Sequence, residues 1–380
     1  MKQQNGAANE EIPTAPDSAY RPDRRRPRVY CTYFDQKYIH RGLALWRSLR
    51  HVSADALLWI CCLDDETHRF MNRLALPGVH LFSLAQLERH FPDLAAVKAT
   101  RSHVEYYFTC TPSVVRFVLD VAPDVPQVTY LDADLYFFAD PEPLFQELES
   151  ADGAVGIIAH RFPAELKDRE VYGIYNVGWL TFCRDARGMA CLEHWRRNCV
   201  DWCYVQPKDG KFADQKYLDD WPGRFAGVVV LQHKGANVAL WNVNGARVRK
   251  AGRHVAIDDE PLLFYHFHGL AALSSWLFRV AANEYGVELS LAMRRWIYRP
   301  YLCDWREMAA LVAVIGRGDA GRIRGAAVRH LARLLRDRLR GMSGTGGEYL
   351  TLLSPWAHLR AYWRAAHSEL RVNAARRNPR

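Results

Sequence analysis

An apolar segment that ends in two acidic residues constrains this chain more than any other feature. Residues 128–131 follow Pro126, read Val-Thr-Tyr-Leu, and lead directly into Asp132 and Asp134. A short apolar run bounded by proline predicts a buried strand of a parallel sheet. Ligands bind at the carboxyl ends of such strands in open α/β sheets. Since residues i and i+2 of extended backbone face the same side, we expect both carboxylates to face one ligand.

Two carboxylates that face the same way repel each other unless a cation lies between them. A divalent metal is such a cation, and carboxylate oxygens suit Mg²⁺ or Mn²⁺. These ions commonly accompany phosphate groups, so the segment predicts a metal–diphosphate site. The alternative interpretation of the triplet is an acidic turn after a strand, and the strand in front of Asp132 favours the site.

Strands and helices alternate along the chain. In the first part we expect strands at residues 28–33, 57–63, 79–82 and 128–131, and helices at residues 37–50, 66–74 and 112–121, the last with Pro112 in its first turn. Further on we expect strands at residues 154–158, 180–182, 228–231 and 262–269, and helices at residues 144–148, 186–203 and 210–221. This alternation is typical of an α/β domain with a mostly parallel sheet. No Gly-x-Gly-x-x-Gly follows the first strand, which disfavours a dehydrogenase-type dinucleotide fold.

Charge divides the chain into unequal parts. The 380 residues carry a net charge of +9, and residues 291–380 hold 18 arginines but only 6 acidic residues. We expect a disordered tail at residues 1–27, a folded domain at residues 28–285 and a basic helical region at residues 286–380. Residues 317–340 carry leucines at helical spacing among arginines, which predicts either a helix packed on the domain or a basic helix on an anionic membrane surface. Nucleic acid is disfavoured as a partner, since the rest of the chain is close to neutral and the predicted site is lined by carboxylates.

The sequence also predicts a cytoplasmic protein. Residues 1–23 lack the apolar core of a signal peptide, and no apolar run approaches the ~18 residues of a membrane span. Nine cysteines without a Cys-x-x-Cys pair argue against a disulfide framework. With the basic tail, we expect a cytoplasmic location that includes the inner face of the plasma membrane.

Four short motifs occur in a fixed order along residues 28–270. They are Tyr130–Asp134 (Asp-x-Asp), Tyr175–Gly178 (Asn-Val-Gly), Phe212–Gln215 (Asp-Gln) and His266–Gly269 (His-Phe-x-Gly). In this order they resemble the GT-A-fold glycosyltransferases, and most of all family 8, the group of glycogenin and the lipopolysaccharide galactosyltransferases. There are two departures: the family's Asn-Ala-Gly reads Asn-Val-Gly here, and the lysine that follows His-Phe-x-Gly, a usual diphosphate contact, is absent from residues 270–273.

The resemblance implies a Rossmann-like GT-A domain with the activity of a hexosyltransferase. Such an enzyme moves a sugar from a nucleotide-diphosphate sugar, a UDP-sugar in the first instance, to a glycan or lipid-linked acceptor. By the same resemblance the anomeric configuration is retained, and the reaction serves bacterial surface polysaccharide assembly.

The resemblance also implies roles for particular residues. Asp132, Asp134 and His266 would hold Mn²⁺ or Mg²⁺, and the nitrogen ligand favours Mn²⁺. Asp214 and Gln215 would support the catalytic step. The other donor-binding residues would be Thr32, Tyr33, Arg116, Ala133, Asn176, Gly178 and Gly269.

Three alternatives stay open beside this interpretation. His266 on an apolar strand is by itself more typical of a buried core histidine, and His268 faces the same side by parity. A haloacid-dehalogenase-type phosphatase also carries Asp-x-Asp after a strand, but normally after the first strand and followed by Thr or Val, whereas Tyr136 stands here. A non-catalytic sugar-binding protein would suit the 12 Trp and 18 Tyr, although it would not need a metal-binding pair.

Overall fold

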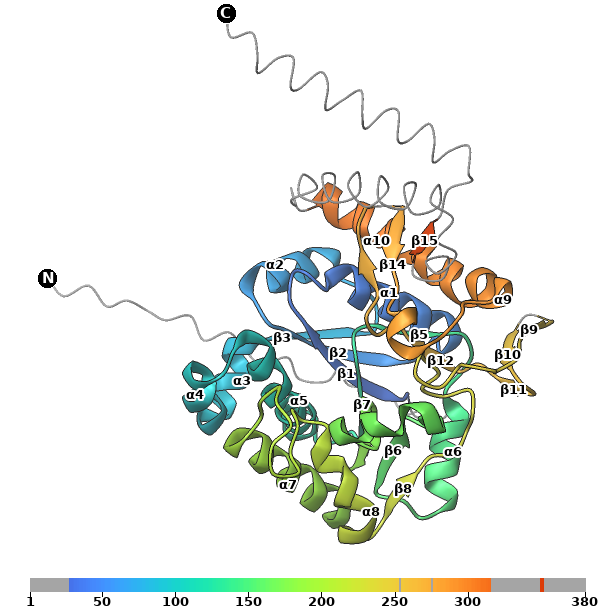
Figure 1. Cartoon of the computed structure of the whole chain (residues 1–380). Helices are drawn as coiled ribbons and strands as arrows, with labels where there is room; N and C mark the ends of the chain where they lie inside the picture. The colour runs from blue at the N-terminus through green and yellow to red at the C-terminus, as the bar shows by residue number, and fades with distance from the viewer. Residues whose placement is uncertain (1–26, 253, 275, 316–348, 352–380) are drawn as a thin grey trace, which may run out of the picture.

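A seven-stranded mixed sheet forms the centre of the domain (Figure 1). The computed structural model describes residues 27–252, 254–274, 276–315 and 349–351. In the sheet order β3-β2-β1-β4-β7-β6-β8, β7 runs antiparallel to both of its neighbours and every other pair is parallel. The strands are β1 (Val29–Phe34), β2 (Leu57–Cys62), β3 (Val79–Ser83), β4 (Gln127–Leu131), β6 (Val155–Ala159), β7 (Tyr175–Cys183) and β8 (Val228–Val230).

Helices cover both faces of this sheet. On one face lie α3 (Leu84–His90), α4 (Pro92–Val97), α5 (His103–Val121) and α7 (Ala186–Asp201). On the other lie α1 (Ile39–Val52), α2 (Asp65–Leu74) and α6 (Glu142–Ser150). Because both faces are buried, the strands are nearly continuous apolar runs, as parallel sheets require. The predicted α/β fold class, with a mostly parallel sheet and flanking helices, is confirmed.

The helix α5 begins earlier than its sequence pattern suggested. The Ser102 hydroxyl accepts the Glu105 N–H, and the Glu105 carboxylate accepts the Ser102 N–H, which together form a capping box. Pro112 therefore lies inside the helix. Our expectation that it lies in the first turn was wrong. The middle of α5 is buried against the sheet and α7, and this packing keeps the helix continuous although proline lacks an N–H.

A second, two-stranded sheet lies beside the central one. In it β5 (Leu135–Phe137) pairs antiparallel with β12 (Phe264–His266), so that His266 lies opposite Leu135. The core under this small sheet brings together Tyr136, Phe267 and Tyr301. Residues far apart in sequence thus form one packed layer.

The described part of the C-terminal region packs on the domain. Residues 286–315, which we expected within a separate basic region, end in α10 (Arg299–Ile315), and its Tyr301 ring stacks on Phe267 with centroids 3.8 Å apart. Arg47 of α1 forms an ion pair with Asp304 at 3.5 Å. Residues 286–315 therefore belong to the same packed body as β5 and β12. The expected tail at residues 1–26 and the arginine-rich helix expected at residues 317–340 lie outside the described residues.

The remaining elements are short. They are η1 (Lys98–Thr100), η2 (Ala164–Tyr172), η3 (Lys216–Asp220), α8 (Trp221–Arg224), β9 (Val248–Ala251), β10 (His254–Ile257), β11 (Glu260–Pro261), β13 (Ala271–Ala272), β14 (Leu277–Arg279), η4 (Ala282–Tyr285), α9 (Leu291–Met293), η5 (Arg294–Tyr298) and β15 (Tyr349–Thr351). The helix expected at residues 210–221 is broken because Gly210 and Ala213 have positive φ angles of 71° and 46°, which a right-handed helix cannot contain. Within the described residues, no helix has both the length and the apolarity that a membrane span requires.

Candidate active site

Asp132 and Asp134 lie in a turn between β4 and β5, at the carboxyl edge of the central sheet. The Leu135 N–H donates to the Asp132 carbonyl at 3.2 Å, which closes the turn. Our prediction of extended backbone at these residues is therefore wrong. The turn nevertheless directs both carboxylates toward His266. On the β4 side, the Tyr130 hydroxyl donates to Asp132 Oδ1 at 2.9 Å and fixes that carboxylate.

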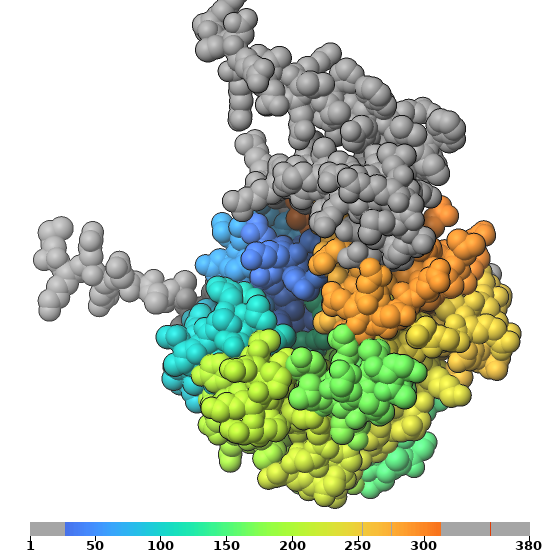
Figure 2. All heavy atoms as spheres, in the orientation of Figure 1, coloured from blue at the N-terminus to red at the C-terminus, as the bar shows by residue number. Residues whose placement is uncertain are grey.

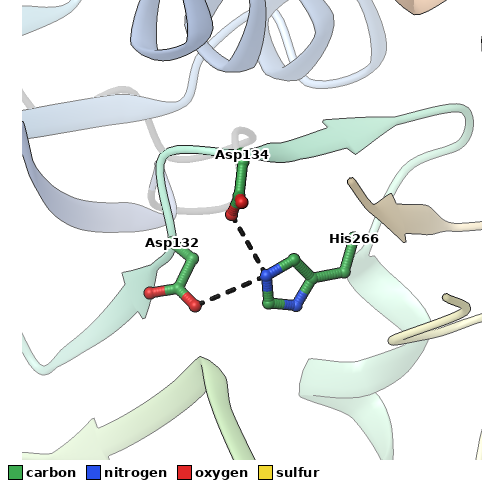
Figure 3. Close-up of side chains that lie close together, drawn as sticks. All are labelled: Asp132, Asp134 and His266. Carbon is green, nitrogen blue, oxygen red and sulfur yellow. Dashed lines mark ion pairs between the residues drawn. The ribbon is translucent and has the colours of Figure 1, made fainter. Parts of the chain in front are cut away.

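His266 completes a three-residue cluster with the two carboxylates. Its Nε2 lies 3.1 Å from Asp134 Oδ1 and 3.6 Å from Asp132 Oδ2 (Figure 3). One ligand atom from each residue lies within 4.8 Å of the others. Two carboxylate oxygens and an imidazole nitrogen are a donor set that fits Mn²⁺ or Mg²⁺. His268, which parity left as a rival, is exposed and is not part of this cluster.

Gly178 makes room for the imidazole ring. A Cβ atom added to Gly178 would lie 3.0 Å from His266 Nδ1 and 2.6 Å from Asn176 Oδ1. The Trp241 ring packs edge-on against His266 from another side, with centroids 5.1 Å apart. Within the described residues His266 Nδ1 has no hydrogen-bond partner. Packing against Gly178 and Trp241, together with the contact of Nε2 with Asp134 at 3.1 Å, therefore sets the position of the ring.

The cluster shifts the pKa of each of its members. Burial raises the pKa of Asp132 to about 6, with a further contribution from the charge of Asp134. Burial alone would raise the pKa of Asp134 too, but the adjacent imidazole holds it well below its usual range. Burial would lower the pKa of His266, and the two carboxylates raise it above its ordinary value. A proton on His266 and a divalent cation thus compete for the same group of atoms.

The cluster lies in a large cleft of about 1370 Å³. In Figure 2 the surface is hollowed where the blue N-terminal segments, the teal start of α5, the green segment around η2 and the orange C-terminal segment meet. The cationic side chains among the described residues of its lining are Lys37, Arg69 and Arg169. Such a volume exceeds that of a single small metabolite pocket and suits a ligand of several groups.

Asn176 and Gln215 line this cleft next to the cluster. Asn176 is the second residue of β7, and its Oδ1 accepts the Gly178 N–H at 3.0 Å. Its Nδ2 lies 3.3 Å from Gln215 Oε1, so the two amides predicted for the donor site are hydrogen bonded to each other.

Asp214 also lines the cleft, but it is only 5% exposed. One carboxylate oxygen accepts the Thr111 hydroxyl at 2.8 Å, and the Asp214 carbonyl accepts the Trp195 indole N–H at 2.8 Å. Burial raises the pKa of this carboxyl to about 7. Tyr33, which also lines the cleft, lies 3.1 Å from the same Thr111 hydroxyl.

Four predicted donor-site residues do not line the cleft, namely Thr32, Arg116, Gly178 and Gly269. Arg116 lies on α5 and forms ion pairs with Asp120 of the same helix at 2.8 Å and with Glu193 of α7 at 3.0 Å. Its guanidinium group is therefore paired at the contact between α5 and α7. Thr32 is fully buried within β1. Gly269 has a φ of 72° and turns the chain after the histidines. The expected donor contact of Arg116 is corrected on this ground: the residue points to a different surface of the helix.

Sequence reasoning missed three residues that shape the site. His160, at the end of β6, and Trp241 line the cleft, and both are buried. Asp219 accepts the Ile174 N–H at 2.7 Å and pairs with Lys216 at 2.7 Å. No motif surrounds these residues; only the position of His160 at the carboxyl end of a strand was a usable signal.

Comparison with known proteins gives two relatives that match 65% and 72% of this chain. No protein-family model matches the sequence. YfnF of Bacillus subtilis (strain 168) is 35% identical over 252 residues, which cover 65% of this chain and 82% of YfnF. The chain belongs to the YfnF family. YfnD of the same organism is 27% identical over 284 residues, covering 72% of this chain and 88% of YfnD. Both relatives are named as uncharacterized proteins, so family membership carries no activity with it.

Solved structures with a similar fold include several glycosyltransferases. The galactosyltransferase LgtC, in complex with donor and acceptor sugar analogues, is 15% identical with a TM-score of 0.44, covering 78% of this chain and 99% of LgtC. Mouse xyloside xylosyltransferase 1 is 13% identical with a TM-score of 0.42, covering 64% of this chain and 98% of its own. Likeness at this level carries no substrate or mechanism over to this chain.

Proposed function

We propose that this protein is a divalent-metal-dependent glycosyltransferase that uses a nucleoside-diphosphate sugar. The observation that carries the proposal is the Asp132, Asp134 and His266 cluster at the carboxyl edge of the sheet, inside a cleft of about 1370 Å³. The cleft also holds the paired amides of Asn176 and Gln215. The motif resemblance and the GT-A fold support the same activity.

The three cluster residues would hold the metal ion, with Mn²⁺ favoured over Mg²⁺ by the imidazole nitrogen. When bound, a divalent cation would supply Lewis-acid stabilisation of the charge that develops on the departing nucleoside diphosphate. Lys37 and Arg169, which line the cleft, would offer additional positive charge. They would take over the contact of the absent lysine after Gly269.

Asn176, Gln215 and Asp214 would contact the donor sugar. Because Asp214 is buried and accepts the Thr111 hydroxyl, we assign it hydrogen bonding to a sugar hydroxyl and not nucleophilic attack. Gln215 would stabilise the positive charge that develops on the sugar ring. We propose retention of configuration, by the resemblance of Asn176, Asp214, Gln215 and His266 to a retaining family.

For the acceptor we propose a glycan or a lipid-linked saccharide, and for the donor a UDP-sugar. The proposed setting is surface polysaccharide assembly at the cytoplasmic face of the membrane. The arginine-rich segment at residues 317–340 that suggested a membrane contact lies outside the described residues. Co-sedimentation with anionic and neutral liposomes tests that contact separately.

Turnover of a labelled UDP-sugar panel with and without added Mn²⁺ tests the function. Wild type should release UDP and should lose this activity with EDTA. Asp134→Asn and His266→Ala should each reduce turnover by ~100-fold or more, since loss of a ligand exceeds the ~10–100-fold cost of outer-shell changes. Asp152→Asn is the matched control: this side chain is 91% exposed, and asparagine tolerates its positive φ of 48°.

The outcomes separate the candidate functions. Full turnover of Asp134→Asn at saturating Mn²⁺ would rule out the metal site. Binding of UDP-sugar without any turnover, with all acceptors tried, would favour a sugar-binding protein. Release of phosphate from simple phosphate esters would favour a phosphatase. NMR of the anomeric proton of the product would decide between retention and inversion.

A further inference from the structure

One hydrogen-bond chain joins His160 to the Asn176 and Gln215 side chains. His160 Nδ1 lies 3.1 Å from the Ile174 carbonyl oxygen, and its Nε2 lies 3.2 Å from Asn176 Nδ2. Asn176 Nδ2 lies 3.3 Å from Gln215 Oε1, and Gln215 Nε2 donates to the Tyr172 carbonyl at 3.1 Å. The chain thus begins and ends on backbone carbonyls two residues apart.

The chemistry of these groups permits only one direction for the chain. A carbonyl oxygen can only accept, so His160 Nδ1 must carry the proton and Nε2 of the neutral ring must accept. Asn176 then has to present its NH₂ group to His160, which leaves Oδ1 for the Gly178 N–H at 3.0 Å. The other Asn176 proton goes to Gln215 Oε1, and this sets the orientation of Gln215 as well. The Ile174 carbonyl acting through His160, the Gly178 N–H and the Tyr172 carbonyl therefore all require the same orientation of the two amides.

The surroundings of His160 keep its ring neutral and in place. The side chain is 5% exposed and stacks on Phe162 with centroids 4.7 Å apart and an interplanar angle of 8°. Burial lowers the pKa of His160 to about 3. The Asn242 side-chain N–H donates to the backbone carbonyl of His160 at 2.8 Å. A charged ring would place a donor against the Asn176 NH₂ group, and the buried site resists that state.

In this chain of hydrogen bonds, both N–H groups of the Asn176 side chain already have an acceptor. One N–H goes to His160, the other to Gln215, and Oδ1 keeps one free lone pair after accepting Gly178. Gln215 keeps one free N–H and one free lone pair. Toward a ligand the pair thus offers two oxygen acceptors and one N–H. The two oxygen acceptors match a hydroxyl group that donates its proton, and the single N–H can donate to one further acceptor.

We propose that His160 is a positioning residue that orients Asn176 and Gln215, so that this pair selects a donor sugar by accepting a hydrogen bond from one of its hydroxyl groups. This inference rests on the proposed function for the nature of the ligand, but the orientation of the amides does not depend on it.

Two substitutions of His160 separate the positioning role from simple packing. The amide of asparagine falls near the place of Nδ1, whereas that of glutamine falls near the place of Nε2. His160→Gln can still accept from Asn176, while His160→Asn keeps the Ile174 contact and loses that acceptor. We expect kcat/KM to fall about tenfold or more in His160→Asn, as for a buried hydrogen bond left unmade, and to stay within about threefold of wild type in His160→Gln. His254→Asn, at the exposed first residue of β10 and outside the cleft, is the matched control.

Monodeoxy donor analogues test the selected hydroxyl directly. At one sugar position, removal of the hydroxyl should cost wild type about tenfold in kcat/KM and should cost His160→Asn almost nothing more. A packing defect would reduce the activity on all analogues by the same factor. Equal losses in His160→Asn and His160→Gln at equal thermal stability, or no position with this coupling, would overturn the proposal.

A readout without substrate distinguishes failure of this inference from failure of the proposed function. In ¹⁵N-histidine-labelled protein, long-range ¹H–¹⁵N correlation should show His160 as the neutral Nδ1–H tautomer across pH 5–8. An Nε2–H tautomer or a protonated ring would overturn the chain of hydrogen bonds. The expected tautomer in a protein that turns over no nucleotide sugar would leave the positioning role standing and reject only the glycosyltransferase assignment.

Discussion

At the scale of single residues, the site depends on a close approach that only one residue type allows. Gly178 lies against both His266 and Asn176, and a Cβ there would come within 3.0 Å of the imidazole. Real Cβ atoms do not make contacts as short as the 2.6 Å to Asn176 Oδ1. The glycine of the Asn-Val-Gly motif is therefore explained by space around the cluster. It needs no contact with a ligand.

We expect Gly178→Ala to weaken Mn²⁺ binding by roughly tenfold, in the range of outer-shell changes to a metal site, while the domain stays folded. The imidazole or the Asn176 amide has to move by several tenths of an ångström to admit the methyl group. Isothermal titration with Mn²⁺ and the thermal unfolding midpoint measure the two effects. Gly223→Ala is the control, since a Cβ at that position meets no atom within 4 Å. Unchanged Mn²⁺ affinity in Gly178→Ala would show that the ring is not held by this contact.

At the scale of elements, the antiparallel pair β5 and β12 assembles the site. β5 begins directly after Asp134, and β12 ends in His266, opposite Leu135. The helix α10 packs against this pair of strands. Its Tyr301 ring stacks on Phe267, the residue after β12, with ring centroids 3.8 Å apart. The C-terminal helix thus supports the strand that supplies the nitrogen ligand.

Tyr301→Ala should destabilise the domain by about 3–5 kcal/mol, because it removes a buried aromatic ring from a packed core. Tyr301→Phe should stay within about 1 kcal/mol of wild type, since the Tyr301 hydroxyl has no hydrogen-bond partner among the described residues. Urea unfolding of both variants measures this difference. A loss in Tyr301→Phe as large as in Tyr301→Ala would mean that the hydroxyl, and not the ring, holds α10 in place.

At the scale of the whole molecule, a buried acid links stability to pH. Asp214 is 5% exposed, and burial raises its pKa to about 7, whereas an unfolded aspartate titrates near ~3.9. The native state thus binds more protons than the unfolded state between these values. The contribution of the Asp214 carboxyl to stability is fully present below the unfolded pKa and is lost as pH rises through about 7.

Asp214→Asn should therefore stabilise the protein at high pH and have little effect at low pH. A shift of about three pH units at ~1.4 kcal/mol each gives an upper bound of ~4 kcal/mol at pH 8. The asparagine oxygen can still accept the Thr111 hydroxyl, so this hydrogen bond is kept. Urea unfolding at pH 5, 6, 7 and 8 should show the advantage of the variant growing with pH. The exposed control Asp152→Asn should show no such trend, and a pH-independent effect in Asp214→Asn would contradict the raised pKa.

Local sequence signals were sufficient for the strands of the central sheet and for one half of the site. The apolar run before Asp132 predicted β4 within one residue, because burial of both faces of a parallel strand leaves a local pattern. The break at residues 210–215 was missed, since positive φ at Ala213 has no local signature in an alanine.

The other half of the site was decided by tertiary structure. His266 lies more than a hundred residues beyond Asp134, and only the antiparallel register of β5 with β12 places its ring between the two carboxylates. The resemblance pointed to this histidine, whereas its place on an apolar strand was by itself more typical of a core residue. Arg116 and His160 show the same limit: packing of α5 against α7 turns the arginine away, and the end of β6 brings the histidine to Asn176. Periodicity records which residues are buried, whereas the partner of a buried polar group depends on which strands and helices pack together.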